Sequence, residues 1–240
     1  MLNVLHSSDL HGDWKDVLRF RNFDVWIDSG DFFPNKTRGT PEEKRYQTRW
    51  FANKGVGERL TEWLAGRPLI SVSGNHDYVS LTKLMREAGA RAYQATPKGV
   101  EVDGVEYAGF RQVPYIFGEW AGETHQGDFR SLVDEVFDVP PDILVTHAGP
   151  ADILSGGDRY HGGINSLASA LAWQPHTIQA HFFGHDHEFG SQTREEVGVI
   201  FSNSATKPKI VHIAGLRPTQ NPSKPRRTRR PRRARRSRGA

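Results

Sequence analysis

The chain has 240 residues, of which 36% are hydrophobic and 10% aromatic, so it is long and apolar enough to bury one sizeable core. It contains no cysteine, which excludes disulfide bonds and zinc–thiolate sites. Because Met1–Leu5 lacks the basic start of a secretory signal and no run approaches the roughly 18 apolar residues of a membrane helix, we expect a cytoplasmic protein without a membrane partner.

The net charge of +4 is unevenly distributed along the chain. Arg217–Ala240 holds ten arginines and one lysine with no acidic residue, so the preceding residues together are near −7. This segment also has four prolines and no apolar residue except alanine, which predicts a disordered tail because such a segment can bury little surface. We therefore expect one folded domain over residues 1–216 and a basic tail over residues 217–240.

The first predicted strand, Leu2–Ser8, is apolar and ends in the sequence Asp-Leu-His-Gly. On an extended segment, residues two apart point in the same direction, so Asp9 and His11 would share a direction. This pattern predicts either a pair of ligands or a polar loop that follows a buried strand.

A short helix is predicted over Asp13–Phe20, and Phe23–Asp28 has the apolar pattern of a second strand. Asp31 follows this strand at the same relative place that Asp9 has after the first. Asp28 is either a supporting carboxylate or an exposed acid. The repetition of an acid after a strand favours a shared site.

Pro41–Gly66 has aromatic and aliphatic residues at helical spacing and predicts one broken helix or two short ones. The third strand, Pro68–Val72, is followed by Asn75, His76 and Asp77. Asparagine is a neutral oxygen ligand, and the adjacent histidine and aspartate indicate an imidazole held by a carboxylate.

A helix is predicted over Leu81–Ala88, and the Asp-Gly pair within Val100–Tyr107 predicts a hairpin. The strand continues toward Arg111. A guanidinium group matches the oxygens of a phosphate, so Arg111 is a candidate substrate contact, with an ordinary surface arginine as the alternative.

The pattern of Asp128–Val136 predicts an amphipathic helix capped by Asp128, and Ile143–Val145 predicts a fourth strand that leads to His147. The glycine-rich stretch Ser155–Gly163 predicts an irregular loop. Its residues Arg159 and His161 are candidate substrate contacts, and a flexible surface loop is the alternative.

Ile164–Trp173 predicts a helix, and Ile178–Phe183 predicts the fifth strand, which delivers His185 and His187. Two further strands are predicted to close the fold, Val197–Ser202 and Lys209–Ile213.

Five predicted strands thus end in loops that carry aspartate, histidine or asparagine. In α/β proteins the carboxyl ends of the strands form the ligand crevice, so these side chains are expected to converge. A mixed oxygen and nitrogen set without cysteine suits manganese, iron or zinc. Seven ligands are too many for one ion but suit two ions that share a bridging carboxylate. The candidates are Asp9, His11, Asp31, Asn75, His147, His185 and His187.

The order of these motifs resembles the calcineurin-like metallophosphoesterase family. The matching segments are Asp9-Leu10-His11, Gly30-Asp31, Gly74-Asn75-His76-Asp77, His147 and Gly184-His185-Asp186-His187. They span most of residues 1–216. The resemblance implies an α/β fold in which a sandwich of two β-sheets is flanked by helices, a four-layer α/β/β/α arrangement.

The resemblance also implies a role for each matching residue. One metal would be bound by Asp9, His11, Asp31 and His187. The other would be bound by Asp31, Asn75, His147 and His185, which makes Asp31 the bridge. His76 would face the phosphate and protonate the leaving oxygen or stabilise its charge, and Asp77 would orient it.

The function that the resemblance implies is that of a phosphoester hydrolase with two divalent ions, expected to be manganese, with iron, zinc, nickel or cobalt as alternatives. Attack by a hydroxide that bridges the two metals is implied. Ser73 replaces the arginine that precedes this motif in the phosphoprotein phosphatases, which favours a phosphodiesterase for small or nucleotide substrates. A phosphomonoesterase and a non-catalytic scaffold that binds nucleic acid or protein are the alternatives.

The basic tail adds a candidate partner. Eleven cations could neutralise several phosphates and so give salt-dependent affinity for nucleic acid. A solvated low-complexity extension and a tail that folds back onto the acidic domain are the alternatives.

Overall fold

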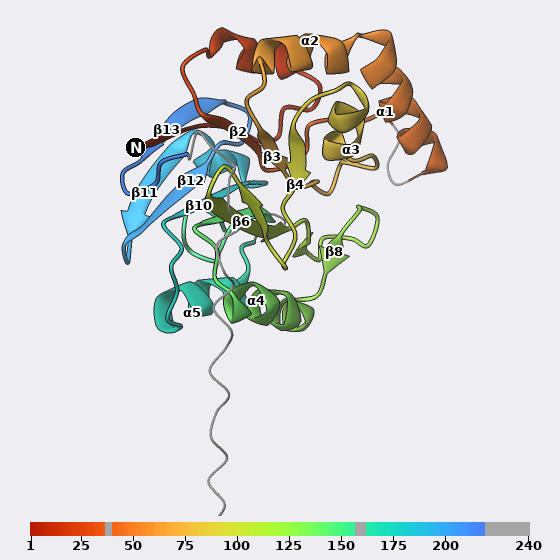
Figure 1. Ribbon diagram of the computed structural model, residues 1–240. Coiled ribbons are helices and arrows are strands. Elements are labelled where there is room, and N and C mark those ends of the chain that lie inside the picture. Colours follow the sequence, from red (N-terminus) through yellow and green to blue (C-terminus); the bar gives the residue numbers. More distant parts are fainter. Residues whose placement is uncertain (37–39, 157–161, 219–240) are drawn as a thin grey trace, which may run out of the picture.

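Two β-sheets pack face to face between two layers of helices in the computed structural model, which describes residues 1–36, 40–156 and 162–218 (Figure 1). The first sheet has the strand order β13 (Lys209–Ile213), β1 (Leu2–Ser7), β2 (Val25–Asp28), β3 (Leu69–Ser71) and β4 (Ala92–Gln94). The second has the order β11 (Gln192–Glu196), β12 (Val199–Asn203), β10 (Ala180–Gly184), β9 (Ile143–Ala148), β6 (Val105–Phe110) and β5 (Val100–Val102).

Parallel strands form the centre of each sheet. β1, β2, β3 and β4 are parallel, and so are β6, β9, β10 and β12, whereas β13, β5 and β11 pair antiparallel to their neighbours. A separate pair, β7 (Val113–Pro114) and β8 (Glu123–Thr124), is also parallel. The carboxyl ends of the central strands are therefore available to form one crevice.

Alternating side chains of the central strands fill different cores. In β2, Val25 and Ile27 belong to the core between the two sheets, and Trp26 belongs to the core under the first helical layer. In β10, Phe182 faces the core between the sheets and Phe183 the core under the second helical layer. Because both faces are buried, these strands are nearly continuous apolar runs.

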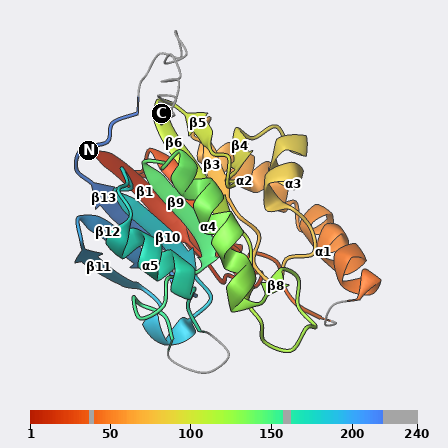
Figure 2. The ribbon, with the colours of Figure 1, turned by 90° about the horizontal axis from the view of Figure 1, so that it is seen from below.

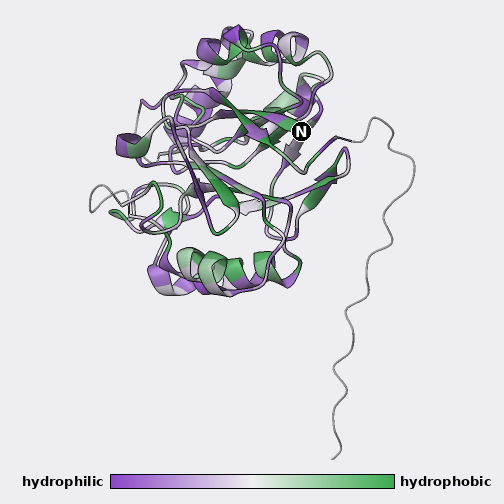
Figure 3. Ribbon diagram, turned by 90° about the vertical axis from the view of Figure 1, so that its left-hand side faces the viewer, coloured by the Kyte–Doolittle hydropathy of each residue, from purple (hydrophilic) through white to green (hydrophobic). Residues whose placement is uncertain are grey.

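The helices cover the outer faces of the sheets. The first layer contains η1 (Trp14–Arg19), α1 (Pro41–Asn53), α2 (Val56–Leu64) and α3 (Leu81–Glu87). The second contains α4 (Phe129–Asp138) and α5 (Asn165–Trp173), which lie across the second sheet (Figure 2). Short helical turns are η2 (Gln126–Asp128) and η3 (His187–Phe189). Both layers carry hydrophobic and hydrophilic residues, as expected for helices with one buried face (Figure 3).

The two-sheet sandwich flanked by helices confirms the predicted fold class. The predicted pair of short helices is present as α1 and α2, with Gly55 between them in the left-handed conformation at φ 58°. One detail is wrong: Asp128 precedes α4 but its side chain makes no capping hydrogen bond. Among the helices of the described ranges, none has the length and apolar character needed to span a bilayer.

Most of the basic tail and two candidate substrate contacts lie outside the described residues. These are the basic tail from residue 219 onward and the candidate contacts Arg159 and His161. The division into a domain over residues 1–216 and a tail therefore remains a prediction.

Candidate metal centre

The loops that follow β1, β2, β3 and β10 meet at one edge of the two sheets, next to the carboxyl-terminal end of β9, which carries His147. They surround a hollow of about 240 Å³. Its lining consists of Asp9, His11, Asp31, Asn75, His76, Ile116, Phe117, Trp120, His185 and His187. His147 lies behind this surface and is fully buried. The structure thus brings together every residue predicted as a ligand.

The carboxylate of Asp31 lies at the centre of the cluster. Its Oδ2 atom is 3.3 Å from Nε2 of His147, 3.8 Å from Nε2 of His76 and 4.0 Å from Nε2 of His11. Its other oxygen, Oδ1, accepts a hydrogen bond of 2.8 Å from the amide of His76. The Asp31 side chain is 2% exposed, so this carboxylate is buried.

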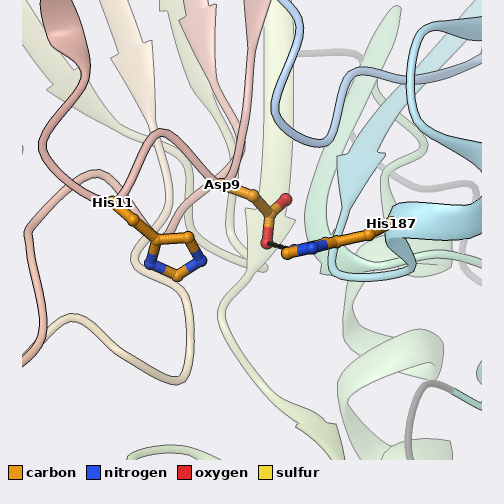
Figure 4. Close-up of side chains that lie close together, drawn as sticks. All are labelled: Asp9, His11 and His187. Atoms are coloured by element: carbon orange, nitrogen blue, oxygen red, sulfur yellow. Dashed lines mark hydrogen bonds and ion pairs between the residues drawn. The ribbon is translucent and has the colours of Figure 1, made fainter.

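Asp9 forms the second carboxylate of the cluster. Its Oδ1 atom is 3.2 Å from Nε2 of His187, and Figure 4 shows this contact with His11 on the other side of Asp9. Oδ2 accepts a hydrogen bond of 2.9 Å from the amide of His185. The loop after β10 is therefore tied to the loop after β1.

The charges at this centre favour a cation. Although burial raises the pKa of both carboxyl groups, the neighbouring histidines lower the pKa of Asp31 to about 2 and that of Asp9 further. Burial lowers the pKa of His147, but the nearby carboxylates of Asp31 and Asp9 outweigh it and raise the value to about 10. The ionised, buried carboxylates of Asp31 and Asp9 are thus stabilised by positive charge in the site.

The donor set fits divalent metal ions. Ligand atoms come within 4.8 Å of one another in three groups: Asp9, His11 and His187; His11, Asp31 and His76; and Asp9, Asp31 and His147. His147 donates from Nδ1 to the carbonyl of Ser29 at 2.8 Å, which turns its Nε2 toward Asp31 and toward Oδ1 of Asn75 at 3.0 Å. Nδ1 of His11 is buried and has no hydrogen-bond partner among the described residues.

The backbone at the cluster differs from the extended segments that the sequence predicted. Non-glycine residues rarely adopt the left-handed conformation, yet Asp9, His11, Asp31 and His185 have φ angles of 54°, 44°, 57° and 67°. His187 begins the helical turn η3. The prediction that residues two apart share a direction on an extended segment was therefore wrong, although the side chains do converge.

Two glycines allow the loops to approach the carboxylates. A Cβ atom on Gly74 would lie 2.0 Å from Oδ1 of Asp31, and a Cβ atom on Gly184 would lie 2.2 Å from Oδ2 of Asp9. Any side chain at either position would displace a carboxylate of the cluster. The glycines of these motifs are therefore required by space.

Asp77 does not orient His76, contrary to the prediction. Its carboxylate accepts hydrogen bonds from the amides of Asp31 at 2.8 Å, Phe33 at 3.2 Å and Gly74 at 2.8 Å. Burial, together with the charge of Asp31, raises the pKa of Asp77 to about 6. Asp77 instead fastens the loops after β2 and β3 to each other.

His76 is held by two residues that the sequence did not indicate. Its Nδ1 atom is hydrogen-bonded to the side-chain amide of Asn35, and its ring lies 4.1 Å from that of Trp120. Burial lowers the pKa of His76. Asn35 and Trp120 belong to no motif with a fixed spacing to His76, so only the folded chain reveals them.

Arg111 and Asp28 support the loops from behind the cluster. Nη2 of Arg111 donates to the carbonyls of Gly74 at 3.1 Å and Asp77 at 3.0 Å, and Arg111 does not line the hollow. Asp28 is fully buried and accepts a hydrogen bond of 2.7 Å from Ser7, so it is not an exposed acid. Burial raises the pKa of Asp28 well above its usual range.

Comparison with known proteins gives a family match. The sequence profile described as calcineurin-like phosphoesterase matches residues 2–189. Among solved structures, the chain resembles the calcineurin-like phosphoesterase YfkN from Bacillus subtilis at 12% identity, covering 89% of this chain and 86% of that chain with a TM-score of 0.44. No match was found among curated proteins.

Proposed function

The chain belongs to the calcineurin-like phosphoesterase family and is a metal-dependent phosphoesterase, and from this premise we propose that it prefers phosphodiesters of small or nucleotide type. The proposed preference rests on the charges of the residues that line the hollow. Among the described residues that line it, there is no lysine and no arginine. A phosphomonoester carries more negative charge than a diester and gains more from cationic side chains. The described part of the lining therefore favours the diester.

The family depends on two metals, and the cluster can supply ligands for both. We assign one ion to Asp9, His11, Asp31 and His187. We assign the other to Asp31, Asn75, His147 and His185. Such a pair, when bound, lowers the pKa of water toward neutrality and offsets charge on phosphate oxygens. Manganese is the proposed ion because the carboxylate and amide oxygens suit it, and iron, zinc and nickel are the alternatives because imidazole suits them.

Asp31 is proposed as the shared ligand because its Oδ2 atom faces three imidazoles within 4.0 Å. Its position is fixed from behind, because Asp77 accepts a hydrogen bond from its amide. The backbone therefore holds the carboxylate in place before any ion binds.

His76 is proposed to hold the proton that the leaving oxygen receives. Asn35 occupies its Nδ1 atom, so Nε2 is the atom that faces the cluster, 3.8 Å from Asp31. The ring cannot turn freely, because Trp120 packs against it. A positioned general acid of this kind assists departure of an alkoxide.

The diester preference is tested by hydrolysis of an aryl phosphodiester beside the matching aryl phosphomonoester with manganese-loaded protein. We expect a higher kcat/KM for the diester, with Asp31→Ala as the inactive control. Faster cleavage of the monoester would identify a phosphomonoesterase. Absence of metal-dependent cleavage of both esters would contradict the assignment as an enzyme and favour a scaffold.

A further inference from the structure

One side of the metal-centre hollow is apolar. It is formed by Ile116, Phe117 and Trp120, which lie between β7 and β8. Phe117 is 53% exposed, an unusual position for a phenylalanine beside a cluster of charged ligands. We call residues 116–120 the aromatic loop. Polar side chains form the rest of the lining, so the hollow has a polar part and an apolar wall.

The aromatic loop is held in shape by one carboxylate. Oε2 of Glu123 accepts hydrogen bonds from the amides of Ile116 at 2.8 Å, Phe117 at 2.9 Å and Gly118 at 2.6 Å. Oε1 accepts another from the amide of Trp120 at 2.9 Å. Four amides that converge on one side chain fix the backbone of the loop. The hydrogen bonds to Glu123 therefore hold the apolar wall in a defined conformation.

The aromatic loop is also fixed relative to the metal ligands. The amide of Ala121 donates to the carbonyl of Asn75 at 3.1 Å, and the Trp120 ring packs on that of His76. The hydroxyl of Tyr78 donates to the carbonyl of Glu119 at 3.4 Å. A phosphoester bound with its phosphate at the ligand cluster would thus place its organic group beside the aromatic loop.

We propose that the aromatic loop binds the planar aromatic arm of the phosphoester, such as a nucleobase, with Phe117 as the principal contact. This inference rests on the proposed function and narrows its substrate class. A nucleobase stacked on an aromatic side chain is stabilised by about 1–3 kcal/mol, which corresponds to roughly 5- to 150-fold in affinity. Because the ring of Phe117 lines the hollow and is also exposed, the base would extend along this ring.

The test measures binding of three phosphates to manganese-loaded protein by calorimetry. Thymidine 5′-monophosphate, hexyl phosphate and methyl phosphate carry the same charged group and differ in the arm. We expect the nucleotide to bind most tightly. Phe117→Ala should weaken nucleotide binding about 5- to 150-fold and leave methyl phosphate unchanged, whereas Phe117→Tyr, which keeps the ring, should retain nucleotide binding.

Tyr115→Ala is the matched control. Tyr115 is 49% exposed and adjoins the aromatic loop, but it stacks on His125 and does not line the hollow, so its removal should not change nucleotide binding. Equal binding of the nucleotide and hexyl phosphate, or unchanged nucleotide binding in Phe117→Ala, would overturn the inference while the proposed function stands. Failure of all three phosphates to bind would overturn the inference alone, because all three are monoesters and the proposed preference for diesters is tested separately with the two aryl esters.

Discussion

Four proposed metal ligands have a strained backbone conformation that places their side chains in the cluster. A left-handed non-glycine residue costs on the order of 1 kcal/mol or more, and four proposed ligands adopt this conformation. Hydrogen bonds hold them there: the amide of Asp9 donates to the carbonyl of Gly30 at 2.8 Å, and that of His11 to the carbonyl of Asp31 at 2.9 Å. The ligands are thus arranged by the loops before a metal binds.

The role of His76 can be separated from that of the metal ligands by the choice of leaving group. His76→Ala should reduce turnover of alkyl phosphodiesters about 10²- to 10⁴-fold, because a poor leaving group needs a proton. Aryl diesters with activated leaving groups should lose much less. The measurement is kcat for both substrates in the variant and the wild type. Equal losses would remove the role as general acid.

The close approach of Gly184 to Asp9 makes a second prediction at this scale. A methyl group at residue 184 would overlap Oδ2 of Asp9, so Gly184→Ala should lose most metal-dependent activity and about 1–3 kcal/mol of the free energy of unfolding. Gly127→Ala is the control, because a Cβ atom there meets nothing within 4 Å. Both are measured by turnover and urea unfolding. Equal turnover and equal free energy of unfolding in Gly184→Ala and Gly127→Ala would contradict the steric argument.

At the scale of elements, the strands were easier to predict than the loops that they position. The apolar runs of β1, β2, β9 and β10 are visible in the sequence because both faces are buried. β11 was missed because Gln192–Glu196 is a polar, exposed edge strand, and β7 and β8 are only two residues long. The left-handed ligands and the contacts of Asp77 depend on loops from distant strands, which local patterns do not encode.

A buried hydrogen bond between β9 and β10 predicts how the free energy of unfolding depends on pH. Thr146 donates to the carbonyl of Ala148 at 2.6 Å, so its hydroxyl accepts from Nε2 of His181 at 2.7 Å. Burial lowers the pKa of His181 to about 3. Between about pH 6.5 and 3 the unfolded chain therefore binds a proton that the folded chain does not, and this group makes the protein less stable as the pH falls.

The expected contribution of His181 is about 1.4 kcal/mol of unfolding free energy per pH unit within that window. His181→Gln should flatten the pH dependence between pH 6.5 and 4.5, whereas His125→Gln, at an exposed position, should not. Urea unfolding at several pH values measures both slopes. An unchanged slope in His181→Gln would show that the buried imidazole does not control acid stability.

The whole molecule places one crevice at the common edge of two sheets, and this could be anticipated from the order of the motifs. Five strand ends carry the ligands, three from the first sheet and two from the second. The sequence did not show that Arg111 would face the carbonyls of the loops instead of the hollow, because its partners are backbone atoms 34 and 37 residues away. The aromatic loop likewise has no motif.

Charge segregation belongs to the same scale. We propose that the basic segment from residue 217 onward binds nucleic acid, since it carries eleven cations and no acid. Deletion of residues 217–240 should leave turnover of small diesters unchanged and reduce both the affinity for single-stranded RNA and its dependence on salt. Fluorescence anisotropy at two salt concentrations measures this. Unchanged RNA binding would show that the tail is not involved.

The proposed two-metal centre, bridged by Asp31, is tested most directly by metal content. Manganese per chain would be measured by mass spectrometry after dialysis for the wild type, Asp31→Ala and the control Asp152→Ala, which lies outside the cluster. We predict two ions in the wild type and the control, and at most one in Asp31→Ala, together with loss of phosphoesterase activity. Two ions retained in Asp31→Ala, or only one in the wild type, would contradict the bridge.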